Sequence, residues 1–113
     1  MKIYHNPRCS KSRQGLAILT DAKVDFEIIE YLKHPPSAQE IEEIIAKLNI
    51  DPIDLVRKNE AVWKENFKGK DLDNKQIIKA MSENPKLIER PIVIHNDKAV
   101  IGRPPEKITN LIK

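Results

Sequence analysis

The chain has 113 residues, of which 40% are hydrophobic and 33% are charged, and its formal net charge is +3 at pH 7. This length suits one domain, and the composition is typical of a globular protein without an apolar run long enough to cross a membrane. Because 17 acidic residues balance the cations and aromatic residues make up only 4% of the chain, a nucleic-acid-binding surface is not indicated. The small positive excess better suits a small anion.

Cysteine usage and the first residues indicate the compartment. Cys9 is the only cysteine, so the chain cannot form an internal disulfide, and a lone reactive thiol suits a reducing environment. The N-terminus shows no signal-peptide pattern, because charged residues stand where an apolar segment would be needed. We therefore expect a cytoplasmic protein.

The chain opens with a predicted strand, turn and helix. Residues 1–5 are typical of a short strand, Asn6-Pro7 of a turn, and residues 10–21 of a helix with one apolar side. Gly15 would let this helix pack closely against a sheet.

A second strand is expected at residues 24–32. Here Val24, Phe26 and Ile28 alternate with acidic residues, the period of a strand with one buried face. Strand, helix and strand within about 30 residues predict a parallel, right-handed βαβ unit.

The middle of the chain, roughly residues 37–85, is expected to form a helical insertion. Ser37 and Glu40 have the spacing of a capping box, which predicts a helix from this point. Asp51-Pro52 indicates the start of a short helix that carries Ile53, Val56 and Arg57.

The rest of the insertion is less regular. Residues 58–73 are polar and contain a glycine, so both a helix and a loop remain open for them. Asp73 or Asn74 then caps another helix, which ends before Pro85.

The C-terminal part predicts a hairpin followed by a helix. Residues 91–95 and 98–101 are typical of strands joined by a tight turn at Asn96-Asp97, and Pro104-Pro105-Glu106 opens the helix. Pro91 suits the first residue of a strand and a cis peptide bond beside an active site.

The element order predicts an α/β, thioredoxin-like fold. It consists of a mixed four-stranded sheet flanked by helices, with the helical insertion between the second and third strands, in a single domain over residues 1–113.

Cys9 is expected at the N-terminus of the first helix. Unpaired backbone N–H groups and the positive end of the helix dipole gather there, and Arg8, Lys11 and Arg13 add positive charge. These groups favour the thiolate, so the pKa of Cys9 should lie below the ~8.5 of a free cysteine. Cys9 is therefore a candidate nucleophile.

The same helix start predicts an anion site. Free N–H groups in a turn that leads into a helix can hold an oxyanion against the sulfur. Ser12 is placed to direct its hydroxyl at the thiolate or the anion. Two roles remain open for His5: it raises the thiolate fraction when protonated, or it fixes the turn by hydrogen bonding.

The sequence resembles the glutaredoxin-coupled arsenate reductases, the ArsC-type family, over essentially its whole length. The nine-residue motif H-N-P-x-C-x-x-S-R at residues 5–13 is the most specific match. The other matching motifs are Tyr31-Leu32 followed by Pro35-Pro36-Ser37, Leu55-Val56-Arg57-Lys58-Asn59, Arg90-Pro91-Ile92-Val93 and Gly102-Arg103-Pro104.

The resemblance implies that Cys9 attacks arsenate while Arg57, Arg90 and Arg103 hold the oxyanion. Guanidinium groups suit this role, because they stay charged and offer paired N–H donors. Arg13 adds to the anion-binding charge.

The resemblance also implies the partners of the reaction. Glutathione would attack the thiolate–arsenic adduct, arsenite would leave, and glutaredoxin would resolve the mixed disulfide on Cys9. The lack of a second, resolving cysteine in the sequence itself argues for an external thiol. We expect no metal site and no tightly bound cofactor, with glutathione as a co-substrate.

Two other functions remain open. Cys9-Ser10-Lys11-Ser12 also has the C-x-x-S form of monothiol glutaredoxins, which would suit a glutathione-dependent thiol–disulfide oxidoreductase. A disulfide substrate does not need the arginines. The Spx regulators, which bind RNA polymerase, have a similar fold but commonly carry a C-x-x-C switch, and Ser12 removes its second sulfur.

Overall fold

A computed structural model describes residues 1–112, and this part of the chain forms two compact units. The first combines residues 1–34 with the chain from Arg90 onward, and the second is Pro35–Glu89. The expectation of a single domain with an insertion at roughly 37–85 stays a prediction.

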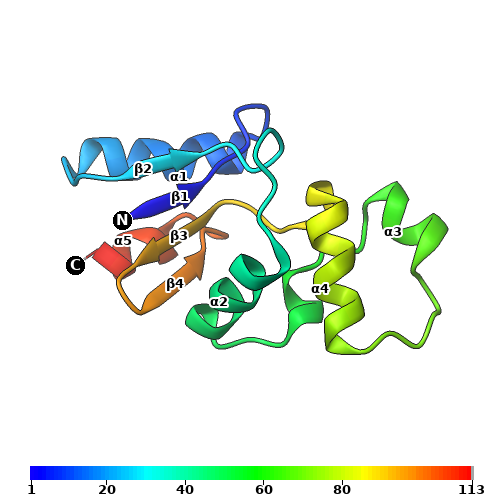
Figure 1. Cartoon of the computed structure of the whole chain (residues 1–113). Helices are drawn as coiled ribbons and strands as arrows, with labels where there is room; N and C mark the ends of the chain where they lie inside the picture. Colours follow the sequence, from blue (N-terminus) through cyan, green and yellow to red (C-terminus); the bar gives the residue numbers. More distant parts are fainter. Residues whose placement is uncertain (113) are drawn as a thin grey trace. The chain divides into compact units, whose positions relative to one another are not determined.

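The first unit is built on a mixed sheet, which is four-stranded within residues 1–112. Its spatial order is β2-β1-β3-β4; β1 runs parallel to β2 and antiparallel to β3, and β3 and β4 form a hairpin (Figure 1). The strands are β1 (Lys2–Tyr4), β2 (Glu27–Ile29), β3 (Ile92–His95) and β4 (Lys98–Ile101). The predicted thioredoxin-like α/β arrangement is confirmed.

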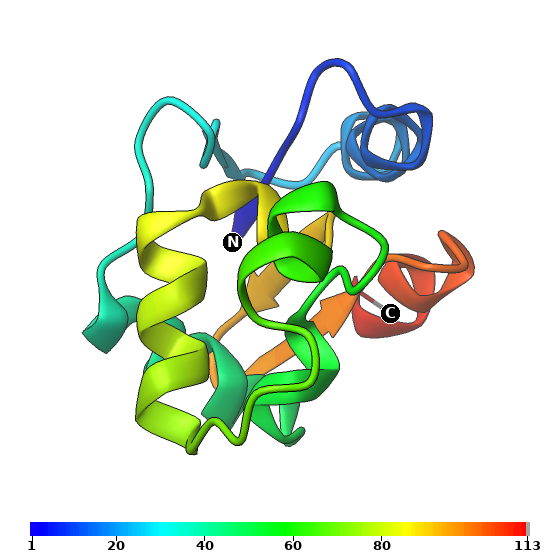
Figure 2. The same ribbon diagram turned by 90° about the vertical axis from the view of Figure 1, so that its right-hand side faces the viewer.

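Two helices of this unit, α1 (Ser10–Asp21) and α5 (Glu106–Ile112), lie on the same side of the sheet (Figures 1 and 2). They contact each other, and α5 also contacts β3 and β4. Apolar side chains from both helices and two strands form the buried core here, namely Ile3, Leu19, Val93 and Ile108. This packing fixes the start of α1 against the sheet.

The close approach of α1 to the sheet depends on glycine. A Cβ built on Gly15 would lie 2.8 Å from Ile108 Cδ1 and 2.9 Å from Pro91 Cγ. A Cβ on Gly102 would meet the same two atoms at 2.6 and 2.9 Å. Gly15 is a site of close packing, as expected, but the atoms that it accommodates belong to Ile108 of α5 and to Pro91, which precedes β3, rather than to a strand of the sheet.

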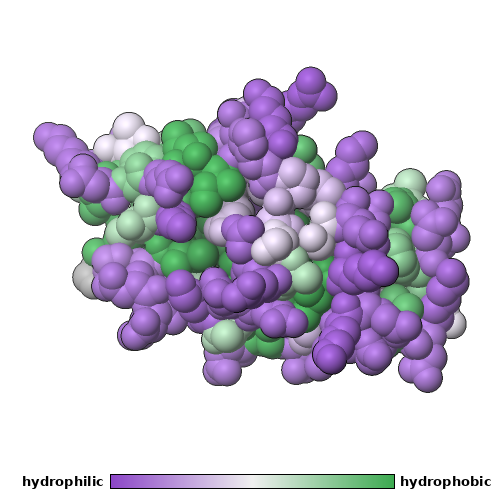
Figure 3. Space-filling view, viewed as in Figure 1, coloured by the Kyte–Doolittle hydropathy of each residue, from purple (hydrophilic) through white to green (hydrophobic). Residues whose placement is uncertain are grey.

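The second strand is shorter than the predicted 24–32. β1 offers only Lys2–Tyr4 as a partner before its chain turns away, so the parallel ladder ends with Glu27–Ile29. The expected buried face is also wrong at Ile28, which is 48% exposed because β2 is an edge strand. Figure 3 shows hydrophobic surface over β2.

The second unit is mainly helical. Its elements are α2 (Ala38–Leu48), the 3₁₀ helix η1 (Pro52–Leu55), α3 (Ala61–Asn66), α4 (Asn74–Glu83) and the 3₁₀ helix η2 (Pro85–Leu87). The capping box predicted at Ser37 and Glu40 is confirmed at the start of α2. Of the two caps left open for the later helix, Asp73 begins α4, and the structure adds a capping box with Gln76. The undecided stretch 58–73 contains α3.

The prediction that Val56 and Arg57 belong to a short helix is wrong. The helix η1 ends at Leu55 because Val56 has extended backbone and forms an antiparallel bridge with Ile88. The Arg57 N–H donates to the Leu87 carbonyl at 2.7 Å, and this bond holds Arg57 on the bridge.

No helix within residues 1–112 combines the length and apolar character needed to cross a membrane.

Candidate functional site

Cys9 is the N-cap residue of α1, as predicted. Its backbone is extended, with φ −98° and ψ 123°, and its N–H donates to the Asn6 carbonyl at 3.0 Å. Its own carbonyl accepts the first helical bond from the Arg13 N–H at 3.0 Å. The turn Asn6–Cys9 therefore delivers a half-buried thiol to the start of a helix.

The pKa of the Cys9 thiol is lowered. Burial raises this pKa and is the largest single influence. It is outweighed by hydrogen bonds from the backbone of Ser12 and Lys11 together with the charge and a side-chain hydrogen bond of Arg90. Because these groups interact with the ionised sulfur, the site favours the thiolate.

The cations next to Cys9 in the sequence act differently from the expectation. Arg8 and Lys11 are exposed, while the Arg13 guanidinium donates through Nη1 to the Pro7 carbonyl at 2.9 Å. Arg13 thereby ties the first turn of α1 to the loop before it. The nearby positive charge that lowers the pKa of Cys9 is that of Arg90, which sequence proximity does not indicate.

His5 and Ser12 form a buried pair under the turn. His5 Nδ1 lies 2.7 Å from Ser12 Oγ, and the Asn6 N–H donates to the same oxygen at 2.9 Å. Ser12 is fully buried. Its hydroxyl thus stabilises the turn, whereas its backbone, rather than its side chain, forms the hydrogen bond that lowers the pKa of Cys9.

The pKa of His5 is lowered, first by burial and then by the charge of Arg13, against the opposing effects of Glu30 and a bond with Ser12. A lowered pKa means that the imidazole is neutral at neutral pH. Of the two roles left open for His5, this geometry favours fixing the turn.

The sheet brings Arg90 and Arg103 to the edge where Cys9 lies. Tyr4 pairs with Ile92, and Ile92 pairs with Ile101, so the end of β1, the start of β3 and the end of β4 are aligned. Arg90 precedes β3 and Arg103 follows β4, each joined to the next proline by a cis peptide bond.

Cys9 and Arg90 are in contact, whereas Arg103 is placed by its strand at the same end of the sheet. The cis bond expected at Pro91 is confirmed.

Arg57 lies in the helical unit and is paired with two carboxylates. Its Nη1 is 2.8 Å from Glu60 Oε1, and its Nε is 3.8 Å from Glu89 Oε1. A role in holding an oxyanion stays a prediction for this residue.

A cavity of about 330 Å³ opens beside the Cys9 turn. It is lined by His5, Asn6, Pro7, Arg8, Glu30, Leu32 and Lys33. The charge of Glu30 acts to raise the pKa of His5, and Glu30 Oε1 lies 3.6 Å from Lys33 Nζ. Sequence reasoning missed Glu30, although its position directly after β2 places it at the edge of the sheet where β1 ends.

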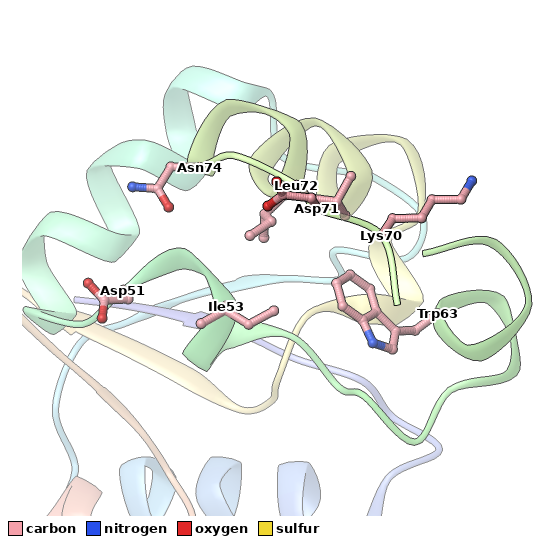
Figure 4. Close-up of a pocket in the computed structure, with 8 residues that line it drawn as sticks. Asp51, Ile53, Trp63, Lys70, Asp71, Leu72 and Asn74 are labelled. Carbon is pink, nitrogen blue, oxygen red and sulfur yellow. The ribbon is translucent and has the colours of Figure 1, made fainter. Parts of the chain in front are cut away.

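A larger cavity, of about 530 Å³, lies in the helical unit (Figure 4). Trp63 and Ile77 are its buried members, and the sequence-predicted site residues do not line it. Its lining is Asp51, Ile53, Trp63, Lys70, Asp71, Leu72, Asn74 and Ile77. Among residues 1–112, no group of three or more His, Cys, Asp and Glu side chains is arranged to hold a metal ion.

Known proteins resemble this chain in sequence and structure. The sequence model of the ArsC family matches residues 4–111. The chain is 43% identical to the uncharacterized protein YfgD of Escherichia coli K12, over 99% of this chain and 96% of that protein. It is 44% identical to an arsenate reductase of Haemophilus influenzae, over 97% of each chain. A solved arsenate reductase from Vibrio cholerae superposes with a TM-score of 0.92 at 40% identity, over 97% of each chain.

Proposed function

Because this chain belongs to the ArsC family, we propose that it is an oxidoreductase that reduces arsenate to arsenite with Cys9 as the nucleophile. The observation that carries the proposal is a thiol at the start of α1 whose pKa is lowered by backbone groups and by Arg90. The similarity to arsenate reductases at 40–44% identity supports the choice of substrate.

The first proposed step forms an adduct. The Cys9 thiolate attacks the arsenic of dihydrogen arsenate, a sulfur–arsenic bond forms, and hydroxide leaves, so arsenic remains As(V). Arg90 is in position to act here, because it already contacts the Cys9 sulfur. Its guanidinium would offset the negative charge that builds up as the thiolate and the oxyanion meet.

The second proposed step is the reduction. A thiolate of glutathione attacks the Cys9 sulfur, the sulfur–arsenic bond breaks, and its electron pair goes to arsenic, which becomes As(III) and leaves as arsenite after protonation. Glutaredoxin then removes glutathione from the mixed disulfide and frees Cys9. An external thiol is required because the sequence contains no second cysteine.

The remaining arginines are proposed to bind the oxyanion. Arg103 stands at the same end of the sheet as Arg90, and Arg13 adds charge at the first turn of α1. Arg57 is proposed for the same role on the family resemblance, and within the helical unit its guanidinium is paired with Glu60 and Glu89.

We also propose a cytoplasmic location and no tightly bound cofactor. Both electrons come from thiols in this scheme, and a reducing compartment supplies them.

A coupled assay tests the function. Purified protein with arsenate, glutathione, glutaredoxin, glutathione reductase and NADPH should oxidise NADPH, and Cys9→Ser should abolish the arsenate-dependent rate. The matched control is Ser10→Ala, which changes the exposed neighbour of Cys9 and leaves the thiol in place. A folded protein that turns over a glutathione mixed disulfide but not arsenate would instead support a thiol–disulfide oxidoreductase.

A further inference from the structure

The cavity beside the Cys9 turn has the chemistry of a binding site for a thiol peptide. We propose that it binds the peptide portion of the zwitterionic thiol, of the glutathione type, that attacks the Cys9 sulfur. This inference rests on the proposed function, since the thiol is needed only if Cys9 is turned over by an external reductant. The wall of the cavity includes Asn6, Pro7 and Arg8, the first three residues of the turn that ends at Cys9.

The lining combines charges of both signs with apolar surface. Arg8 and Lys33 can bind carboxylates, and Glu30 can bind an ammonium group. Pro7 and Leu32 supply apolar contact, and Leu32 is 38% exposed, which is unusual for a large hydrophobic side chain in the described part of this protein. A small inorganic oxyanion has no apolar surface to place there. A peptide with carboxylates, one amine and a methylene chain matches these charged and apolar residues.

The sheet order places this cavity on the side of β1 away from Arg90. Glu30, Leu32 and Lys33 follow β2, whereas Arg90 precedes β3, and β1 lies between β2 and β3. A thiolate that displaces arsenic from the Cys9 sulfur must attack in line with the bond that breaks, on the opposite side from the leaving arsenic. An oxyanion held by Arg90 and a thiol held in the cavity satisfy this requirement.

The reach of such a peptide is sufficient. Arg8 lines the cavity and is bonded to Cys9, so their Cα atoms lie about 3.8 Å apart. An extended tripeptide spans about 10 Å, so its sulfur can meet Cys9 while its ends stay in the cavity. In the step itself, a sulfur–sulfur bond forms as the sulfur–arsenic bond breaks, and the electron pair passes to arsenic.

The test measures thiol selectivity without arsenate. Mixed-disulfide formation on Cys9 is followed by mass spectrometry with oxidised glutathione and, separately, with the uncharged hydroxyethyl disulfide. The quantity compared is the rate constant with oxidised glutathione divided by that with hydroxyethyl disulfide. Because both reactions need the Cys9 thiolate, this ratio does not depend on the thiolate fraction. We expect Arg8→Gln and Lys33→Gln each to lower the ratio about two- to fivefold, as for loss of an exposed charge pair.

Two further variants separate binding in the cavity from general attraction between charges. Leu32→Ser removes apolar contact without changing charge and should also lower the ratio. Lys2→Gln removes a charge at the far end of β1, outside the cavity lining, and should leave the ratio unchanged. An unchanged ratio in Leu32→Ser, or an equal fall in Lys2→Gln, would overturn the proposal.

The steady-state assay separates this inference from the proposed function. If arsenate is reduced, Lys33→Gln should raise the KM for glutathione and leave the KM for arsenate unchanged. Turnover of arsenate with an unchanged KM for glutathione would refute the cavity assignment alone. If the unchanged protein does not turn over arsenate, but Lys33→Gln and Leu32→Ser still lower the disulfide ratio, the choice of arsenate is refuted and the cavity is retained as a glutathione site.

Discussion

Opposing influences act on the charge of the Cys9 sulfur. Burial favours the neutral thiol, whereas backbone hydrogen bonds from Ser12 and Lys11 and the guanidinium of Arg90 favour the thiolate. The thiolate side prevails, so the folded thiol binds its proton less tightly than a free cysteine. The sulfur should therefore remain reactive as the pH falls through the ordinary pKa of cysteine.

The contribution of Arg90 can be measured directly. The rate of alkylation of Cys9 by iodoacetamide should rise with pH around a midpoint below that of a free cysteine, because only the thiolate reacts. In Arg90→Gln this midpoint should move upward, since one of the groups that stabilise the thiolate is lost. Arg8→Gln is the matched control, and a larger shift there than in Arg90→Gln would contradict the assignment.

The Ser12 hydroxyl and the Ser12 backbone N–H are expected to have different effects, the first on stability and the second on the pKa of Cys9. Ser12→Ala removes the acceptor of the Asn6 N–H and the partner of His5 Nδ1 in a buried place, so the free energy of unfolding should fall by about 1–3 kcal/mol. Chemical denaturation followed by circular dichroism gives this value.

The backbone N–H that faces the Cys9 sulfur remains in Ser12→Ala. The midpoint of Cys9 alkylation in this variant should therefore stay close to that of the unchanged protein. A large upward shift with unchanged stability would show that the hydroxyl itself holds the thiolate.

Among the elements, α1 owes its position to the absence of a side chain at Gly15. Gly15 lets the helix approach Ile108 and Pro91, and Gly102 leaves room for the same two residues. Gly102→Ala should lower the free energy of unfolding by about 1–3 kcal/mol, because its Cβ would overlap the Pro91 ring. Thermal or denaturant unfolding measures the loss.

Gly15→Ala should cost less than Gly102→Ala. In a helix interior alanine is favoured over glycine by about 0.5–1 kcal/mol, which offsets part of the overlap. Gln14→Ala, on the exposed side of the same helix, is the matched control and should be neutral or slightly stabilising. Equal stability of all three variants would mean that the sheet and α5 adjust without cost.

Elements with local signals could be predicted from the sequence, and elements fixed by distant partners could not. The capping boxes at Ser37 and Asp73 satisfy backbone groups of the same turn, so a few residues determine the outcome. The length of β2 depends instead on the three residues that β1 offers. Arg57 was misplaced because its backbone follows a bridge to Ile88, and no local pattern encodes that bridge.

The candidate site shows the same division at the scale of the whole molecule. The place of Cys9 at a helix start follows from the sequence of its own turn. Its contact with Arg90 follows from the pairing of Tyr4 with Ile92, which joins strands far apart in the chain. The residues around Cys9 therefore predicted a reactive cysteine, but they assigned the positive charge that lowers its pKa to Arg8, Lys11 and Arg13 rather than to Arg90.

The discontinuous first unit has a consequence for synthesis. Because Arg90 follows the helical unit Pro35–Glu89 in the chain, the guanidinium that faces Cys9 emerges from the ribosome only after that whole unit has been translated. Until then the nascent chain carries its thiol without this partner. A polypeptide truncated before Arg90 would therefore lack the contribution of this residue to the lowered pKa of Cys9.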